Sequence, residues 1–277
     1  MAIKDILVHV DSTAKSDLRL KIGVELAERN EAHLVGLHAK PYPYIPPAAP
    51  DLSPIYGELI DDQQRLIDQD AEAAKKRFDD ALRHTNISQE WRAVTGDPSE
   101  VIRRHARYAD YVIVGQNNAE ADRQAVDLPE GILLTTGRPA IVVPNNPNVK
   151  TFGRNVMVAW DDGIQATRAI HDAMPILQAA ENVTVLAVNP ADTGDHGAMP
   201  CADICHHLAR HGVKAYAYPV TTHEFTTEHM ILKRAFEHGI DLLVMGAYGH
   251  SRMREFVFGG VTAHVLEHMQ LPVLMSH

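Results

Sequence analysis

The stretch Gly246–Thr262, GAYGHSRMREFVFGGVT, decides the fold. The apolar run Leu242–Met245 directly precedes it and predicts a buried strand. After it, four apolar residues recur at the spacing of one helical face: Val261, Val265, Leu266 and Met269. The stretch is therefore expected to be a glycine-bearing turn between a strand and a helix, the unit from which parallel α/β sheets are built.

The residues of this turn suit a phosphate group. Glycine has no Cβ, so main-chain N–H groups can approach a ligand closely. A helix N-terminus adds unpaired N–H donors and a partial positive charge. Four side chains of the turn can also meet phosphate oxygens: His250, Ser251, Arg252 and Arg254. The same glycines also serve an ordinary turn after a strand, so the turn alone leaves both interpretations open.

Length and composition indicate a globular protein of two domains. The chain has 277 residues, of which 45% are hydrophobic and 22% charged. Its net charge of −10 argues against a general nucleic-acid binder, which normally has a basic face. We also expect no membrane insertion, because no apolar stretch approaches the roughly 18 residues that cross a bilayer. The N-terminus lacks the pattern of a secretory leader, and two cysteines make no disulfide framework, so a cytoplasmic location is expected.

The sequence contains an internal repeat. An apolar run ending on an acid, Ile6–Asp11, is followed by a helical pattern and then by a second apolar run, His33–His38. The same order recurs 150 residues later, from Val156 to Val188. Two later runs recur at offsets of 131 and 133 residues, as Leu242–Gly246 after Tyr111–Gly115 and as Pro272–Ser276 after Pro139–Val143. A βαβ unit has therefore been duplicated.

The first copy carries about twenty extra residues between its second and fourth strands. They begin with a proline-rich connection from Pro41 to Pro54, which predicts extended chain. A long helical pattern follows, with apolar residues along one stripe: Leu59, Leu66, Ile67, Ala71, Ala74, Phe78 and Leu82. We expect this helix to pack on the sheet or to cover part of the second half.

Strands that alternate with helical patterns predict an α/β fold. Each half is expected to be a doubly wound, mostly parallel, five-stranded sheet with helices on both faces. The expected domains are residues 1–146 and 152–277, with a polar linker, Pro144–Thr151, between them. In such sheets ligands bind at the carboxyl ends of the strands, which is where Asp161 and Gly246 lie.

Over nearly the whole chain, this pattern resembles two successive copies of the universal stress protein family. The family's fold belongs with the adenine nucleotide alpha hydrolase-like proteins. In the second copy, Gly246, Gly249 and Gly259 match the family's ATP-binding signature, G-x2-G-x9-G-(S/T). Gly260 stands where the signature has a hydroxyl residue, so the hydroxyl would come from Thr262 or be replaced by a main-chain N–H.

The resemblance implies a nucleotide-responsive regulatory protein of the stress response. ATP, with or without magnesium, would be held in the C-terminal domain. Asp161 would contact the adenine side, Val188 would pack on the base, and Trp160 is adjacent. Further contacts would come from the turn and the start of the following helix: Gly246, Gly249, His250, Ser251, Arg252, Gly259, Gly260, Val261 and Thr262.

The first copy departs from the signature. Gln116–Asn118 follow Gly115, so the second glycine is missing, and Val126 and Asp127 lie where the second copy has Gly259 and Gly260. A carboxylate there would repel phosphate, so we predict that the N-terminal domain binds no ATP and has a structural role or a different ligand.

The resemblance also implies that two domains pair through their last strands. Within this chain, Ala140–Val143 would pair with Val273–Ser276. The proline-rich insertion would then be free to join two chains into a homodimer.

Other chemistry is less well supported by the sequence. Cys201 and Cys205, with His196, His206, His207 and His211 nearby, invite a zinc interpretation. On a helix, however, His207 lies about 120° round the axis from Cys201, so a buried stripe of Cys201, Cys205 and Leu208 is expected instead. No P-loop or nucleophile-elbow motif indicates catalysis. The alternatives are a slow ATPase or other nucleotide-transforming enzyme, and an interaction scaffold that binds no nucleotide.

Overall fold

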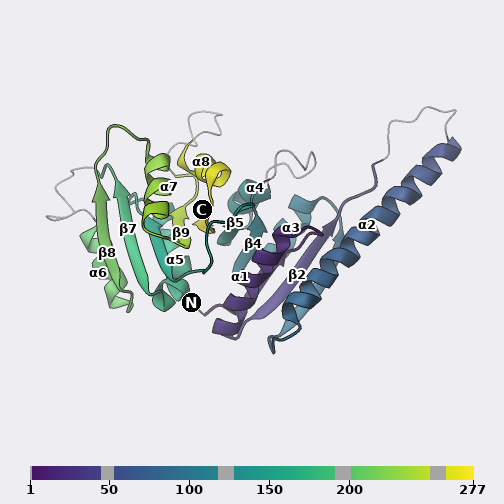
Figure 1. The fold of residues 1–277 in the computed structure, drawn as a ribbon, viewed down its shortest axis with the longest axis horizontal. Helices are drawn as coiled ribbons and strands as arrows, with labels where there is room; N and C mark the ends of the chain where they lie inside the picture. Colours follow the sequence, from purple (N-terminus) through teal and green to yellow (C-terminus); the bar gives the residue numbers. More distant parts are fainter. Residues whose placement is uncertain (1, 45–52, 118–127, 191–200, 250–259) are drawn as a thin grey trace.

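The computed structural model describes residues 2–44, 53–117, 128–190, 201–249 and 260–277 (Figure 1). The strands of the first half are β1 (Asp5–His9), β2 (His33–Lys40), β3 (Gln89–Thr95), β4 (Tyr111–Gly115) and β5 (Ala140–Val143). Those of the second half are β6 (Asn155–Ala159), β7 (Asn182–Val188), β8 (Ala215–Val220), β9 (Leu242–Gly246) and β10 (Val273–Ser276). The strands described form one sheet in the order β3-β2-β1-β4-β5-β10-β9-β6-β7-β8.

Helices cover both faces of this sheet, because the strand residues of both faces are apolar and need cover. The helices are α1 (Lys15–Asn30), α2 (Ser53–Leu82), α3 (Pro98–Ala106), α4 (Leu128–Thr135), α5 (Ile164–Ala179), α6 (Ala202–Arg210), α7 (Thr227–Glu237) and α8 (Val261–His268). One core lies under α1, α2, α5 and α6 and contains Leu20, Phe78 and Ile170. The other lies under α3, α4, α7 and α8 and contains Ile102 and Leu266.

The topology confirms the predicted fold class. Within each half, neighbouring strands are parallel and the strand order reverses beside the first strand, as in doubly wound sheets. The two halves join where β5 pairs with β10 in antiparallel register, with Ile141 opposite Leu274 and Val142 opposite Val273. The predicted pairing of the last strands within one chain is thus confirmed, and it merges two five-stranded sheets into one.

A buried carboxylate fixes the linker between the halves. Asp241 is 2% exposed and accepts hydrogen bonds from the Thr151 hydroxyl at 2.5 Å and from the main-chain N–H groups of Arg154 and Asn155, each at 3.0 Å. Several hydrogen bonds to one buried charge offset its desolvation. The chain therefore enters β6 along a defined path.

Helix α2 differs from the prediction in two ways. It begins at Ser53, so Pro54 lies in its first turn and not in the extended connection; proline is tolerated there because that N–H has no partner within the helix. It also packs on α1, β2 and β3 of its own half and does not cover the second half (Figure 1). Leu59 and Leu66 are 41% and 61% exposed, because they lie about a quarter of a turn from the buried Ala74 and Phe78.

Among the helices that the structure describes, none combines the length and the apolar composition that crossing a bilayer requires.

Candidate functional site

The end of β9 packs directly against the first turn of α5. A Cβ placed on Gly246 would lie 2.7 Å from the main-chain N of Ala166 and from the C and Cβ atoms of Gln165. Atoms of a folded protein do not approach so closely, so only glycine permits this contact. The end of β9 and the first turn of α5 therefore meet at the carboxyl edge of the second half.

Asp161 lies beside this contact and makes a local hydrogen bond. It follows β6, and its Oδ1 accepts a hydrogen bond of 2.9 Å from the N–H of Gly163, the N-cap residue of α5. Its Oδ2 faces Gly249: a Cβ on Gly249 would lie 3.8 Å from this oxygen and 3.7 Å from the Oε1 of Gln165. The structure thus brings together three of the predicted site residues, Asp161, Gly246 and Gly249.

The start of α8 is tied to the same turn. Gly260 is the N-cap residue of α8, with φ 141°, and Val261 is half-buried. The hydroxyl oxygen of the buried Thr262 accepts a hydrogen bond of 3.0 Å from the N–H of Tyr248. This oxygen holds the turn in place, so Thr262 is a positioning group as well as the predicted source of a hydroxyl.

Two further predicted residues lie on opposite faces of the sheet. Trp160 is half-buried and packs on the core under α5 and α6, whereas Val188 packs on the core under α7 and α8. The side chain of Val188 is therefore not brought to the face that carries α5. His250, Ser251, Arg252 and Gly259, which complete the predicted set, lie outside the described residues.

This edge can both donate and accept hydrogen bonds. The N-termini of α5 and α8 carry main-chain N–H groups without a partner inside their helices, together with a partial positive charge, which suits an anion. The carboxylate of Asp161 accepts from hydroxyl or amino groups, and the amide of Gln165 can donate and accept. A nucleotide presents both kinds of group.

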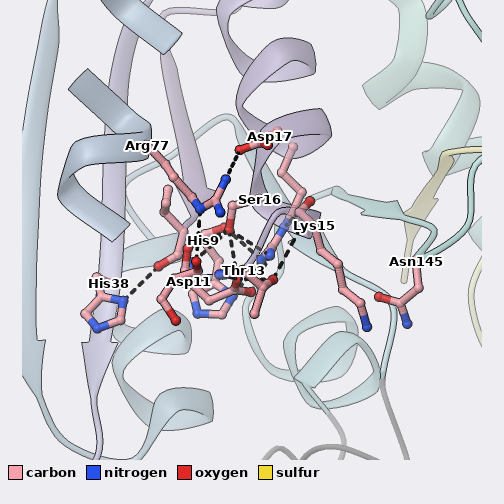
Figure 2. Close-up of polar contacts among 12 residues, drawn as sticks. His9, Asp11, Thr13, Lys15, Ser16, Asp17, His38, Arg77 and Asn145 are labelled. Atoms are coloured by element: carbon pink, nitrogen blue, oxygen red, sulfur yellow. Dashed lines mark hydrogen bonds and ion pairs between the residues drawn. The ribbon is translucent and has the colours of Figure 1, made fainter. Parts of the chain in front are cut away.

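The corresponding place in the first half contains an arginine. Arg19 occupies the position of Ala169 in the second copy, and its side chain is 3% exposed. The guanidinium donates to the main-chain oxygen of His9 at 2.9 Å, to the Nδ1 of His9 at 3.2 Å and to the hydroxyl of Ser16 at 2.9 Å, and it forms an ion pair with Asp11. Figure 2 shows the contacts around His9, Asp11 and Ser16. A Cβ on Gly115 would lie 3.5 to 3.6 Å from this guanidinium, so Arg19 fills the space beside the end of β4.

Electrostatics fix the charge state of this cluster. Burial raises the pKa of Asp11, but the Arg19 charge and hydrogen bonds from Thr13 and Arg19 outweigh burial and hold this pKa well below its ordinary value. Burial and the neighbouring Arg19 charge lower the pKa of His9 to about 3. At neutral pH the cluster is therefore one ion pair beside an uncharged imidazole.

Sequence reasoning missed Arg19. The residues predicted to block the site, Val126 and Asp127, lie outside the described residues, whereas the side chain of Arg19, on α1, lies beside the end of β4. A comparison of the two copies contained the signal, because an arginine replaces Ala169 on the buried stripe of the first helix.

The cysteine region has a structural environment. Cys201 and Leu208 are buried and Cys205 is half-buried, as the predicted stripe requires, although Cys201 is the N-cap of α6 and does not lie within the helix. Burial raises the pKa of the Cys201 thiol to about 11, so it stays protonated at neutral pH. In the part of the chain that the structure describes, no three histidine, cysteine or acidic side chains are arranged to hold a metal ion. His196 lies outside that part.

Fold and site together define a class of protein: a tandem doubly wound α/β chain. In its second half a glycine at the end of β9 packs on the start of α5, and in its first half the Arg19 side chain lies beside the corresponding glycine. The sequence profile described as the universal stress protein family matches residues 2–125 and 153–277. The chain therefore belongs to the universal stress protein family and contains two copies of its domain.

Solved structures share the full architecture. A universal stress protein from Archaeoglobus fulgidus DSM 4304 superposes with a TM-score of 0.72 at 16% identity, covering 98% of this chain and 96% of that one. PA1789, a functionally unknown protein from Pseudomonas aeruginosa PAO1, gives a TM-score of 0.60 at 15% identity, covering 99% and 92%. At these identities the likeness shows the fold alone.

A curated relative matches a short stretch. Universal stress protein Slr1230 of Synechocystis is 49% identical over 47 residues, which are 17% of this chain and 16% of that protein. The match thus spans about a sixth of each protein.

Proposed function

We propose that the C-terminal half binds ATP, with or without Mg²⁺, and that the chain is a cytoplasmic, nucleotide-responsive regulatory protein of the stress response. The observation that carries the proposal is the contact of Gly246 with the first turn of α5, with the Asp161 carboxylate oriented toward Gly249. This contact brings main-chain donors, a helix N-terminus and a fixed acceptor to one edge of the sheet.

In this proposal, each group has a defined role. Main-chain N–H groups of the turn and of the starts of α5 and α8 receive the phosphates, assisted by His250, Ser251 and Arg252. Asp161 accepts a hydrogen bond from the nucleoside. Bound Mg²⁺ would neutralise part of the triphosphate charge, which the chain's net charge of −10 makes valuable.

The first half is proposed to be a structural domain without ATP. Arg19 already satisfies Asp11 there and takes up the volume beside Gly115. The chain is therefore expected to bind one nucleotide and not two.

Calorimetric titration of the full chain with ATP tests the proposal, with mass spectrometry of any nucleotide that co-purifies. We expect one ATP per chain. Gly249→Ala would place a methyl group between Asp161 and Gln165 at ordinary contact distance, so the fold should survive while ATP affinity falls at least about tenfold.

Gly115→Ala is the matched control, because the atoms nearest to its Cβ would be those of the Arg19 side chain, at ordinary contact distance. It should leave ATP affinity unchanged. The proposal fails if the wild-type chain stays empty at millimolar ATP, or if Gly249→Ala binds as well as the wild type does.

A further inference from the structure

Gln165 spans the two glycines that frame the candidate turn. The Cβ of Gln165 lies 2.7 Å from the position that a Cβ on Gly246 would take. The Oε1 of Gln165 lies 3.7 Å from the position that a Cβ on Gly249 would take. The side chain therefore runs along the turn from the end of β9 outward. It is half-buried, so neighbouring atoms restrict its conformation.

The amide of Gln165 is not used in hydrogen bonds within the described part of the chain. The Oδ2 of Asp161 lies 3.8 Å from the same Gly249 position, while the Oδ1 of Asp161 is taken by Gly163. The carboxylate of Asp161 and the amide of Gln165 thus both lie within 4 Å of the Cβ position of Gly249.

This pair suits neighbouring hydroxyl groups. A carboxylate only accepts hydrogen bonds, and a primary amide both donates and accepts. One hydroxyl can donate to Asp161 and the next can exchange a hydrogen bond with Gln165. The counterpart in the first copy is Lys15, a cation without acceptor capacity, so this arrangement belongs to the second copy.

We propose that Gln165, together with Asp161, recognises the ribose hydroxyls of the bound nucleotide and makes the site selective for ribonucleotides over deoxyribonucleotides. The inference rests on the proposed ATP site and assigns its sugar specificity. A polar group that loses its partner hydroxyl remains half-buried and unpaired, which penalises the deoxy compounds.

The test is to measure the Kd of ATP, 2′-deoxy-ATP and 3′-deoxy-ATP for the full-length wild type and for Gln165→Leu, which keeps the volume and removes the hydrogen bonds. We expect the wild type to bind one of the two deoxy compounds about 5- to 10-fold more weakly than ATP, the range for one neutral hydrogen bond. Gln165→Leu should reduce that ratio to about 2 or less by weakening ATP, with the affinity for that deoxy compound nearly unchanged.

Two controls make the result specific. Lys15→Leu changes the same position of the first copy and should leave every ratio at its wild-type value. Gln165→Glu keeps an acceptor oxygen at the same place, so it should weaken all three nucleotides through phosphate repulsion while preserving the preference for the hydroxyl. That pattern would not arise from a misfolded variant.

Failure of the inference is distinguishable from failure of the proposed function. A wild type that binds ATP with the same deoxy ratios as Gln165→Leu refutes the role of Gln165 alone. A wild type that binds none of the three compounds at millimolar concentration refutes the ATP site and the inference with it.

Discussion

At the scale of single residues, Arg19 and Ala169 stand at the same position of the two copies and give the two halves different interiors. Arg19 brings a buried charge that needs Asp11, His9 and Ser16 as partners. Ala169 is buried and brings only a methyl group, which leaves the first turn of α5 free to approach Gly246. The guanidinium packs beside Gly115 in the first copy, whereas main-chain atoms of α5 pack on Gly246 in the second.

Replacing Arg19 with methionine should destabilise the protein. Arg19→Met keeps the length of the side chain, but it removes the cation paired with Asp11 Oδ2 and the donor to the main-chain oxygen and Nδ1 of His9. The Oδ1 of Asp11 keeps its hydrogen bonds from Thr13 and Ser16. Because Asp11 retains some exposure to water, we expect a loss of about 2 kcal/mol in the free energy of unfolding, measured by urea denaturation. Arg83→Met removes an arginine that is 65% exposed and should change the free energy by less than about 0.5 kcal/mol. Equal effects of the two changes would contradict the assigned role of Arg19.

His9 should make stability depend on pH in the acid range. Its pKa in the folded protein is about 3, below the ordinary value of 6.5, so the unfolded chain takes up the proton first. The contribution of neutral His9 to the free energy of unfolding is therefore fully present above pH 6.5, and it is lost as the pH falls toward 3. The slope is at most about 1.4 kcal/mol per pH unit and smaller if water reaches the ring.

The measurement is urea denaturation of the wild type and of His9→Gln at several pH values between 7 and 4. Glutamine can still accept from Arg19 but does not titrate, so the difference between the two proteins should shrink or change sign as the pH falls. Parallel pH curves would show that His9 does not titrate differently in the folded and unfolded chains.

Residues whose role follows from local chemistry were predictable from the sequence, and residues whose role depends on packing were not. Gly246 and Asp161 follow apolar strands, so the parallel fold alone places them at one edge. The direction of the Arg19 side chain depends on how α1 crosses β1 and β4. The spacing of apolar residues along the sequence does not predict that crossing. Likewise, the face to which Val188 points depends on the register of β7, and a shift of one residue reverses it.

At the scale of elements, the contact between β9 and α5 is closer than its counterpart between β4 and α1. The Cβ position of Gly246 falls on main-chain atoms of α5, whereas the atoms nearest to that of Gly115 belong to the Arg19 side chain. Main-chain atoms cannot move without the whole helix, but a long side chain can yield. The same glycine is therefore a strict requirement in the second half and a tolerant position in the first.

Gly246→Ala should separate α5 from β9 and cost about 1–3 kcal/mol of stability, the range for an overpacked core. Gly115→Ala should cost less than about 1 kcal/mol, since its Cβ would lie at ordinary contact distance. Thermal unfolding followed by circular dichroism measures both. If Gly246→Ala is as stable as the wild type, the close contact of strand and helix is not a feature of the folded protein.

The sequence predicted helix α2 where apolar residues recur strongly at helical spacing. It did not predict where this helix begins or which residues lie at the edge of its buried face. The apolar stripe of α2 identified a long helix, but periodicity could not show that Leu59 and Leu66 lie beside the buried line and remain exposed. Its start at Ser53 differs from the prediction, because proline favours extended chain in general but is also tolerated in the first turn of a helix.

At the scale of the whole molecule, the two halves meet in a symmetric strand pairing whose surroundings are not symmetric. On one side, the Tyr111 hydroxyl donates to the main-chain oxygen of Asp172 at 2.5 Å, and the Ser276 hydroxyl donates to the Asp172 carboxylate at 2.8 Å. The residues at the equivalent positions of the other copy are apolar: Leu242, Ile22 and Val143. Pairing of like halves from two chains, first with first or second with second, would place polar groups against apolar ones, so the asymmetry favours pairing of a first half with a second half.

The continuous sheet predicts that both halves unfold together. The chain has two tryptophans, Trp91 in β3 and Trp160 directly after β6, so Trp91→Phe and Trp160→Phe each leave one fluorescent reporter in one half. Urea transitions of the two single-tryptophan proteins should coincide, because the strand pairing at β5 and β10 shares one core between the halves.

Tyr111→Phe, introduced into both single-tryptophan proteins, removes a side-chain hydrogen bond between the halves. It should lower the free energy of unfolding by about 1 kcal/mol in both, although Tyr111 belongs to only one half. Tyr108→Phe is the matched control, since Tyr108 is 79% exposed and should shift neither transition. Two separate transitions, or a shift confined to the Trp91 reporter, would show that the halves fold as independent units and that their shared strand pairing carries little free energy.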